Sequence, residues 1–423
     1  MSRRLIIVPL LLAVLAAGSA DARTIKPLPK QWQKGVNVAA FRWDGFSGDR
    51  FYYWMRQLKN KAHAETAMFS FRWIQYWADP LRSDDQGATD INPAFGNTKD
   101  CKGRPRDDYT RCQTPSFAAL RKAIEYAQKL GMKVALKPLV DVGRNPGSQY
   151  DRDQLNYSEP DARDRWFESY RTMLGRYAAL ARDVDAQMLV IGTGLTNMTD
   201  GETEQMEWRR MIQDIRTGDL MPDAKGGFTG DLTYATRWDT IYSDAYDDAF
   251  QEFFWDELDV IGVEGFWPLI GPKDPDHDNP AVERLRQGWT QNFVAGGLPP
   301  GAALRALHLE YAKPVLLTGL GYLSRGGTSA DPAKGDYAQA AVGGKVNEQA
   351  QERPYRAAFD FWGSVARREH WFHGIYWWNW LPKVGNDTNG DYTPQGKDAE
   401  TELCLRHLGR NAVAKCRPSR MPY

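Results

Sequence analysis

The chain has 423 residues, which exceeds the usual size of a small domain and lies within the range of one large α/β barrel. Its 54 basic residues balance its 54 acidic residues, so its charge gives no reason to expect nucleic acid or an acidic membrane surface as a partner. The 42% hydrophobic content argues against a disordered chain, and the 16 Trp, 19 Tyr and 17 Phe suit flat apolar ligand faces such as sugar rings.

The N-terminus has the pattern of a secretory signal peptide. Arg3 and Arg4 precede an apolar run that ends near Ala17, and small residues follow up to Ala22. We expect residues 1–22 to be removed, which predicts a secreted or periplasmic protein with no membrane span after cleavage. An uncleaved anchor is the alternative interpretation.

Eight short apolar runs alternate with helical segments along the rest of the chain, which indicates a parallel sheet. Most of them are rich in Val, Ile, Leu or aromatic residues, as strands buried on both faces should be. The predicted strands are Gly35–Ala39, Ala67–Phe71, Lys133–Leu139, Met188–Gly192, Leu232–Thr236, Val260–Val263, Pro314–Thr318 and Gly374–Trp378.

Helices are predicted between these strands. Thr114 is the expected N-cap of one helix, with Pro115 at its first position and Gly131 at its end. A second helix is expected over residues 164–181, and a last one over residues 398–408.

Eight β/α units predict an α/β fold of the (β/α)₈ type, a TIM barrel, over residues 33–381. Residues 382–423 are expected to form the loop, the last helix and a tail that carries a disulfide. A doubly wound open sheet is the second possibility, but no Gly-x-Gly-x-x-Gly motif follows the first strand.

The four cysteines form two pairs of near neighbours, Cys101 with Cys112 and Cys404 with Cys416. Four cysteines allow three connectivities, and we prefer the pairing of near neighbours for an exported protein. Free buried thiols are the alternative. Neither pair has zinc-ligand spacing, and we expect no metal and no cofactor. The Asp387-x-Asn389-x-Asp391 spacing resembles a calcium loop but lacks that loop's Gly and final Glu.

In a barrel, functional side chains lie just past the C-terminal ends of the strands, and we call these positions the rim. The rim is rich in Trp, Asn, Asp, Arg and Glu, which fits a polyhydroxylated, uncharged ligand better than a phosphate or a nucleotide. Some of the aromatic residues would instead only plug the barrel mouth. The candidate ligand-binding residues are Trp43, Lys137, Asp141, Asn197, Arg237, Trp238, Glu264, Trp267, Tyr322 and Trp378.

Six segments of the chain, in order and with similar spacing, resemble glycoside hydrolase family 113, whose members are (β/α)₈ barrels typified by β-mannanases. The resemblance implies retaining hydrolysis of β-linked sugars by two glutamates, an acid/base after strand four and a nucleophile after strand seven. The segments are Leu189–Leu195, Leu232–Asp239, Trp255–Gly262 with Phe266–Leu269, Lys313–Tyr322, Lys133–Pro138 with Asp141, and Gly374–Trp380.

Both glutamates implied by the resemblance are absent. The family's Gly-Thr-Glu-Leu motif is matched by a segment with Gly194 in place of Glu, and its Thr-Glu-x-Gly-Tyr motif by a segment with Gly319. A retaining glycosidase needs two carboxyl groups about 5–5.5 Å apart. Glycine carries no side chain, so these positions predict an inactive or impaired enzyme that still binds sugar. A deliberately altered enzyme would show the same pattern.

Other carboxylates are candidates to replace the missing pair. Glu264 ends strand six, where the resemblance implies an Asp, and Asp141 and Asp239 lie at or after strands three and five. Glu264 with either aspartate could run hydrolysis through an activated water. The plainer interpretation is that these carboxylates bind hydroxyls or brace the rim loops.

The sequence therefore predicts a barrel that binds a β-linked polysaccharide, a mannan or a related hexose polymer, without two-glutamate catalysis. The alternative is an active glycosidase or transglycosylase that uses Glu264 with Asp141 or Asp239. A third possibility is an envelope scaffold whose barrel binds another protein.

Overall fold

The structure is a computed structural model. It describes residues 25–75, 91–92, 101, 112–142, 152–157, 159–223, 225–242, 253–293, 297–335, 344–382, 390–409 and 415–419. The predicted signal peptide, residues 1–22, lies outside these residues, as do Asp387 and Asn389 of the calcium-like spacing.

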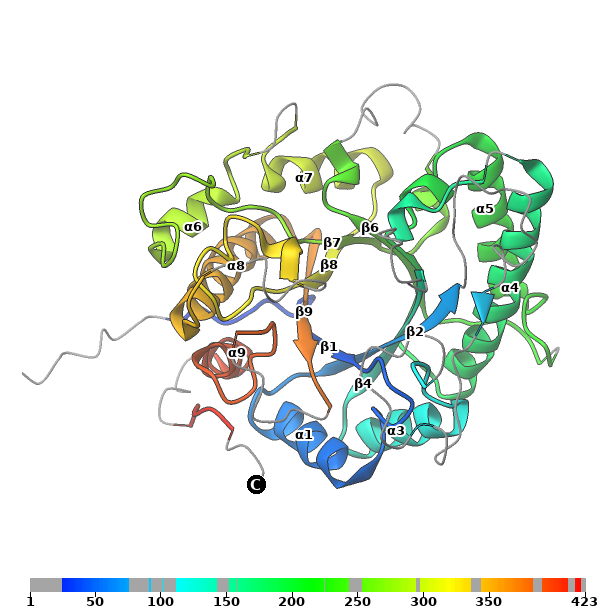
Figure 1. Ribbon diagram of the computed structural model, residues 1–423, viewed down its shortest axis with the longest axis horizontal. Helices are drawn as coiled ribbons and strands as arrows, with labels where there is room; N and C mark the ends of the chain where they lie inside the picture. Colours follow the sequence, from blue (N-terminus) through cyan, green and yellow to red (C-terminus); the bar gives the residue numbers. More distant parts are fainter. Residues whose placement is uncertain are drawn as a thin grey trace, which may run out of the picture.

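Eight parallel strands close into a barrel, with helices around it (Figure 1). The first strand pairs with both the second and the last, which closes the ring. A short ninth strand, β3 (Ile91–Asn92), runs antiparallel to β2 outside the ring. The barrel strands are β1 (Gln33–Ala39), β2 (Thr66–Gln75), β4 (Lys133–Val142), β5 (Met188–Thr193), β6 (Asp231–Arg237), β7 (Ile261–Glu264), β8 (Val315–Leu320) and β9 (Phe372–Trp380). The (β/α)₈ fold and all eight predicted strands are thus confirmed.

Most helices lie outside the ring, between successive strands (Figure 1). They are α1 (Gly48–Asn60), α3 (Phe117–Lys129), α4 (Pro160–Asp183), α5 (Glu202–Thr217), α6 (Val282–Gly288), α7 (Pro300–Tyr311), α8 (Glu348–Glu369) and α9 (Asp398–Leu408). Short 3₁₀ turns include η2 (Arg152–Gln154) and η3 (Thr196–Met198), which follow β4 and β5.

The predicted start of α3 is wrong by two residues. Ser116, not Thr114, is the N-cap, and its Oγ accepts a hydrogen bond from the Ala119 amide at 3.2 Å. Thr114 cannot serve because its hydroxyl donates to the Arg72 carbonyl at 2.7 Å, which attaches it to β2. The contact with β2 therefore prevents Thr114 from capping the helix, and the hydroxyl of Ser116 caps it instead.

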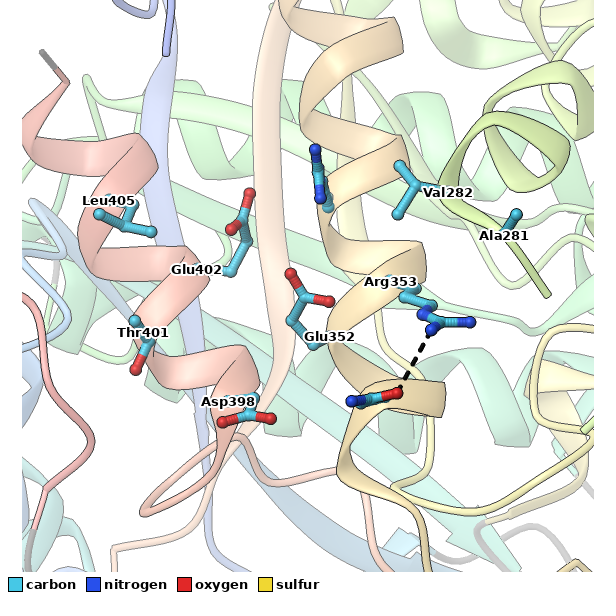
Figure 2. A pocket seen from close by; sticks show the side chains of 10 residues that line it. Ala281, Val282, Glu352, Arg353, Asp398, Thr401, Glu402 and Leu405 are labelled. Carbon is cyan, nitrogen blue, oxygen red and sulfur yellow. Dashed lines mark hydrogen bonds between the residues drawn. The ribbon is translucent and has the colours of Figure 1, made fainter. Parts of the chain in front are cut away.

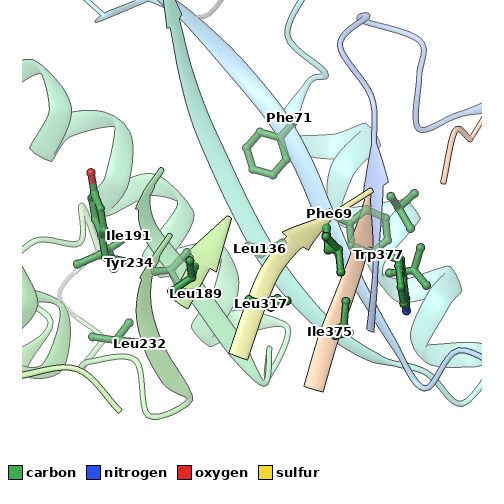
Figure 3. Packing of buried hydrophobic residues seen from close by; sticks show 14 of the residues in the cluster. Phe69, Phe71, Leu136, Leu189, Ile191, Leu232, Tyr234, Leu317, Ile375 and Trp377 are labelled. Carbon is green, nitrogen blue, oxygen red and sulfur yellow. The ribbon is translucent and has the colours of Figure 1, made fainter. Parts of the chain in front are cut away.

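The strands bury both of their faces. Alternate residues, such as Phe69, Leu136 and Leu317, pack outward in the large cluster shared with the helices, several of whose members Figure 3 shows. Their neighbours, such as Met68 and Ala135, form a separate cluster of the strands. Because side chains alternate along a strand, successive residues lie on opposite faces of the sheet. This alternation determines which polar side chains point into the barrel.

Two disulfides join the predicted partners, Cys101 with Cys112 and Cys404 with Cys416. The pairing of near neighbours is therefore confirmed. Among the residues described, no helix combines the length and apolar character that a bilayer crossing requires.

Candidate functional site

A layer of polar side chains lies inside the barrel near the C-terminal ends of the strands. Ser70 donates to the Asn37 amide oxygen at 2.9 Å, and Asn37 donates to the Thr318 carbonyl at 3.0 Å. Lys137 belongs to this layer because it alternates with outward-facing Leu136 along β4. All four side chains are fully or almost fully buried, so each needs its partner.

Glu264 completes the layer at the end of β7. Its Oε1 accepts from Lys137 Nζ at 2.6 Å and from Thr318 Oγ1 at 2.7 Å. The Lys137 side chain is 1% exposed and that of Glu264 is 14% exposed, so this ion pair is largely shielded from water. Removing one partner would leave an uncompensated charge in the barrel, which costs about 3–5 kcal/mol.

Gly319 on β8 lies beside Glu264 on β7, in register with it. A Cβ atom built on Gly319 would lie 2.5 Å from Oε2 of Glu264 and 3.0 Å from its Oε1. Real Cβ contacts are not this short, so the Glu264 carboxylate fills the space in which a side chain at 319 would begin.

Gly194 follows directly after β5. Its φ of +59° is in the left-handed region, where residues with a side chain are strained. A Cβ there would meet Arg237 at 3.5 Å and Arg152 at 3.7 Å, which are ordinary contacts. Two arginine side chains therefore border the place where the resemblance implies a glutamate.

Asp141, near the end of β4, is held by two arginines. Arg72 of β2 donates to its Oδ2 at 2.9 Å, and Arg152 of η2 donates to its Oδ1. Arg72 also donates to the Gln113 side chain at 2.7 Å. Asp141 is 7% exposed, so most of its acceptor capacity faces protein donors.

Arg237 makes a similar network at the end of β6. Its Nε donates to Asp239 Oδ1 at 2.8 Å, and its NH1 lies 2.7 Å from the carboxylate of Asp153 in η2. Together with Arg152, this network joins η2 to β4 and β6. Each of the three aspartates therefore has a cationic partner, and none stands as a lone carboxylate.

The aromatic candidates divide into two groups. Trp43, Trp238 and the polar Asn197 are half-buried and keep part of their surface accessible at the rim. Trp267 and Tyr322 are 1% and 0% exposed, so neither offers a ring face to a ligand in this conformation. Trp267 instead packs 6.3 Å from Trp238 and 6.1 Å from Trp289, measured between ring centroids.

Trp378 lies deeper, at the end of β9. It is 5% exposed, and Lys137 Nζ lies 5.7 Å from the centre of its ring. That distance is within the range of a cation–π contact. Trp378 therefore forms one wall around the Lys137–Glu264 pair.

The disulfide between Cys101 and Cys112 lies next to this site. The Trp43 amide donates to the Cys112 carbonyl at 2.8 Å. The following residue, Gln113, holds Arg72 and through it Asp141. Covalent closure of this loop thus bears on two of the predicted ligand-binding residues.

Several residues that complete the site were not predicted from the sequence. Arg152, Asp153 and Thr318 supply the donors and acceptors around Asp141, Arg237 and Glu264. Arg152 follows Asp141 by eleven positions, a spacing with no periodic signal. Thr318 could have been found, since its alternation with Leu317 places it inside the barrel.

A cavity of about 560 Å³ lies elsewhere, on the outer wall between α6, α8 and α9. Figure 2 shows Glu352 of α8 and Glu402 of α9 directed into the space between the helices. None of the predicted site residues lines it. Among the residues described, no group of three or more His, Cys, Asp or Glu side chains could hold a metal ion. Asp391 of the calcium-like spacing binds Lys397 at 2.9 Å instead.

The strand ends therefore place one carboxylate, Glu264, beside a buried cation, with arginine–aspartate networks on the neighbouring strands. This arrangement can accept hydrogen bonds from hydroxyls and offers indole surface beside them. Of the described acids, Asp141 and Asp239 already accept from guanidinium groups.

Comparison with solved structures supports the fold assignment. A β-1,4-mannanase of glycoside hydrolase family 113 superposes with a TM-score of 0.64 at 22% identity, covering 90% of this chain and 99% of its own. The β-mannanase from Alicyclobacillus acidocaldarius, of the same family, gives 0.63 at 21% identity, covering 92% and 98%. A β-D-glucuronidase from Dictyoglomus thermophilum gives 0.51 at 14% identity, covering 90% and 51%.

Comparison with curated proteins by sequence finds no match. The sequence model of glycoside hydrolase family 113 matches residues 94–397, which is more than half of the chain. The chain therefore belongs to glycoside hydrolase family 113.

Proposed function

We propose that this protein binds a β-linked polysaccharide, a mannan or a related hexose polymer, at the C-terminal rim of its barrel. It does so without the two-glutamate retaining mechanism that the family resemblance implies. The observation that carries this proposal is the pair of glycines at the ends of β5 and β8, Gly194 and Gly319, within a barrel that keeps its aromatic and polar rim.

The neighbours of both glycines support the proposal. Glu264 fills the space at Gly319, and Arg237 and Arg152 border the space at Gly194. At position 319 the Glu264 carboxylate occupies the space for a side chain, and at position 194 the left-handed backbone opposes one. The rim instead offers the half-buried indoles of Trp43 and Trp238 for stacking and the half-buried amide of Asn197 for hydroxyl groups.

The alternative, an active glycosidase that pairs Glu264 with Asp141 or Asp239, finds less support. A general base must take a proton from water, and both oxygens of Asp141 and of Asp239 already accept from arginine. Glu264 is different, because only its Oε1 has protein donors among the residues described.

Calorimetric titration with β-1,4-manno-oligosaccharides tests the proposal, beside an assay for new reducing ends on soluble β-mannan. We expect binding without measurable release of reducing ends. Trp238→Ala should weaken binding about tenfold, which is ~1.4 kcal/mol. Leu309→Ala on the exposed face of α7 is the matched control and should bind as the wild type does.

The outcomes separate the function classes. Mannan cleavage that Glu264→Gln abolishes would favour the active glycosidase. If the chain binds neither manno- nor other β-linked hexose oligosaccharides, the sugar-binding proposal fails and a protein-binding scaffold becomes the better hypothesis.

We also propose that the protein is exported and that residues 1–22 are its signal peptide. Two disulfides support this, because such bonds persist in oxidising compartments. Determination of the N-terminus of protein expressed in a secreting host checks it, and an intact Arg3-Arg4 terminus on the exported protein would contradict it.

A further inference from the structure

Position 264 and position 319 share one space at the ends of adjacent strands. The two residues are register partners, and the pairing of β7 with β8 shifts between Val263 and Glu264. A Cβ on Gly319 would lie within 3.0 Å of three atoms of the Glu264 carboxylate. A carboxylate that reaches over from β7 thus stands where the first atoms of a side chain on β8 would be.

The two oxygens of Glu264 have different surroundings. Lys137 and Thr318 both donate to Oε1. Among the residues described, none donates to Oε2, and the side chain keeps 14% of its surface exposed. Glu264 is therefore a fixed carboxylate with one oxygen held by protein donors and the other open to a ligand.

We infer that Glu264 supplies from β7 the carboxylate that β8 lacks at position 319, and that its Oε2 is the nucleophile of this site toward a bound β-glycoside. The inference rests on the proposed sugar-binding function. It concerns a different residue, on a different strand, from the nucleophile that the family resemblance implies.

The absence of a side chain at Gly194 limits the substrates of such a nucleophile. The nearest side chains there belong to Arg237 and Arg152, and a guanidinium does not give up its proton at ordinary pH. With no acid described beside Gly194, we expect the leaving group to depart without being protonated. Aryl glycosides with acidic phenols meet this condition, whereas the alkoxide leaving group of a polysaccharide does not.

The reaction then has two steps. Oε2 of Glu264 forms a bond to the anomeric carbon while the bond from that carbon to the phenol oxygen breaks, and the electron pair leaves with the phenolate. Water next attacks the anomeric carbon, the ester bond to Oε2 breaks and restores the carboxylate, and the proton of the attacking water passes to solvent. The residues described beside Gly194 offer no general base for the second step, so it should be slow and the glycosyl ester should accumulate.

The test uses the full chain with 2,4-dinitrophenyl β-mannobioside and, in parallel, 2,4-dinitrophenyl β-cellobioside. We expect a burst of about one dinitrophenolate per protein molecule followed by slow turnover. Azide needs no general base, so it should accelerate turnover and yield the glycosyl azide. A 2-deoxy-2-fluoro analogue should label the protein, and peptide mass spectrometry should locate the label on Glu264.

Variants assign the label. Glu264→Gln should lose the burst by about 10²-fold or more while it still binds oligosaccharide in calorimetry. In the double variant Glu264→Ala with Gly319→Glu, the carboxylate returns to β8, and the label should move to position 319. Glu283→Gln on α6 is the control and should leave burst and label unchanged, because Glu283 is exposed and contacts Arg286. Circular dichroism confirms that each variant is folded.

The results distinguish this inference from the proposed function. If oligosaccharides bind but no burst appears, or the label falls on another residue, Glu264 is not a nucleophile and the sugar-binding proposal stands. A burst that survives in Glu264→Gln would likewise show that Glu264 is not the nucleophile. If nothing binds and nothing is labelled, both are overturned.

Discussion

At the scale of single residues, the site depends on which side chains occupy a small space. The residues at positions 264 and 319 are coupled, because the Glu264 side chain on β7 occupies the space that any side chain at position 319 on β8 would enter. This coupling makes a prediction that does not involve any ligand.

Gly319→Ala should lower the free energy of unfolding by about 1–3 kcal/mol, because the new methyl group forces Glu264 away from Lys137 and Thr318. In a Glu264→Asp background the shorter side chain leaves room, and the same change should cost about 1 kcal/mol less. Urea denaturation of the four proteins in the cycle measures this. Gly271→Ala is the control, since its nearest neighbour is 4.0 Å away. Additive costs in the cycle would contradict the coupling.

His407 makes a second prediction at this scale. Burial lowers its pKa to about 3, and its Nδ1 contacts the Ala62 carbonyl at 2.7 Å. An unfolded histidine has a pKa of about 6.5, so between these two values the unfolded chain binds the proton that the folded chain excludes. His407 therefore reduces stability as the pH falls from about 6.5 toward 3.

The free energy of unfolding in urea, measured at several pH values for the wild type and His407→Gln, tests this. The wild type should lose stability more steeply with falling pH than the variant does. Parallel curves would show that His407 titrates alike in both states.

At the scale of elements, the structure shows what the sequence could and could not specify. Apolar runs bounded by turn residues specify the eight strands, and α9 begins and ends as predicted. The prediction that Thr114 caps α3 was wrong because its hydroxyl bonds to the carbonyl of Arg72 on β2, 42 positions away in the chain. The arginines around Asp141 likewise come from two separate segments, Arg72 on β2 and Arg152 on η2.

The burial of Trp267 and Tyr322 could not be predicted either, because it too depends on segments that are distant in the sequence. A residue just past a strand end is exposed or buried according to the loops that pack over it, and those loops have no periodic pattern. Glu264 was predictable as the end of its strand, but the contact with Gly319 depends on a register shift between β7 and β8.

The cap of α3 gives a prediction for a single element. Ser116→Ala should lower the free energy of unfolding by about 1 kcal/mol, because the Ala119 amide loses its acceptor. Ser116→Asp keeps an acceptor at the same position and should restore most of the loss. Thermal melts of the three proteins check this, and equal losses in both variants would show that the hydroxyl does not act as a cap.

At the scale of the whole molecule, ring closure between β1 and β9 brings the two ends of the barrel sequence together. Residues 194 and 319 therefore take positions at the ends of β5 and β8 in one rim, although they are far apart in sequence. A ring of parallel strands places all of its C-terminal ends on one side, which is why a site could be predicted from strand ends alone.

The charge of the whole chain gives a solubility prediction. Equal numbers of acidic and basic residues give a net charge of zero at pH 7, and removing residues 1–22 takes away two basic residues and one acidic residue. Proteins with little net charge associate most readily. Light scattering at high protein concentration should therefore be greatest near pH 7 and fall by pH 9. Scattering that stays level or rises between pH 7 and pH 9 would contradict this.

The loop closed by Cys101 and Cys112 connects the redox state of the surroundings to the rim. Its carbonyl holds the backbone of Trp43, and its neighbour Gln113 steadies Arg72 against Asp141. Reducing this bond would leave the ring of strands intact, since the strands pair through their own backbones. Trp43 and Asp141 would both lose the support that they receive from Cys112 and Gln113. Thiol-containing buffers should therefore weaken ligand affinity long before they unfold the protein.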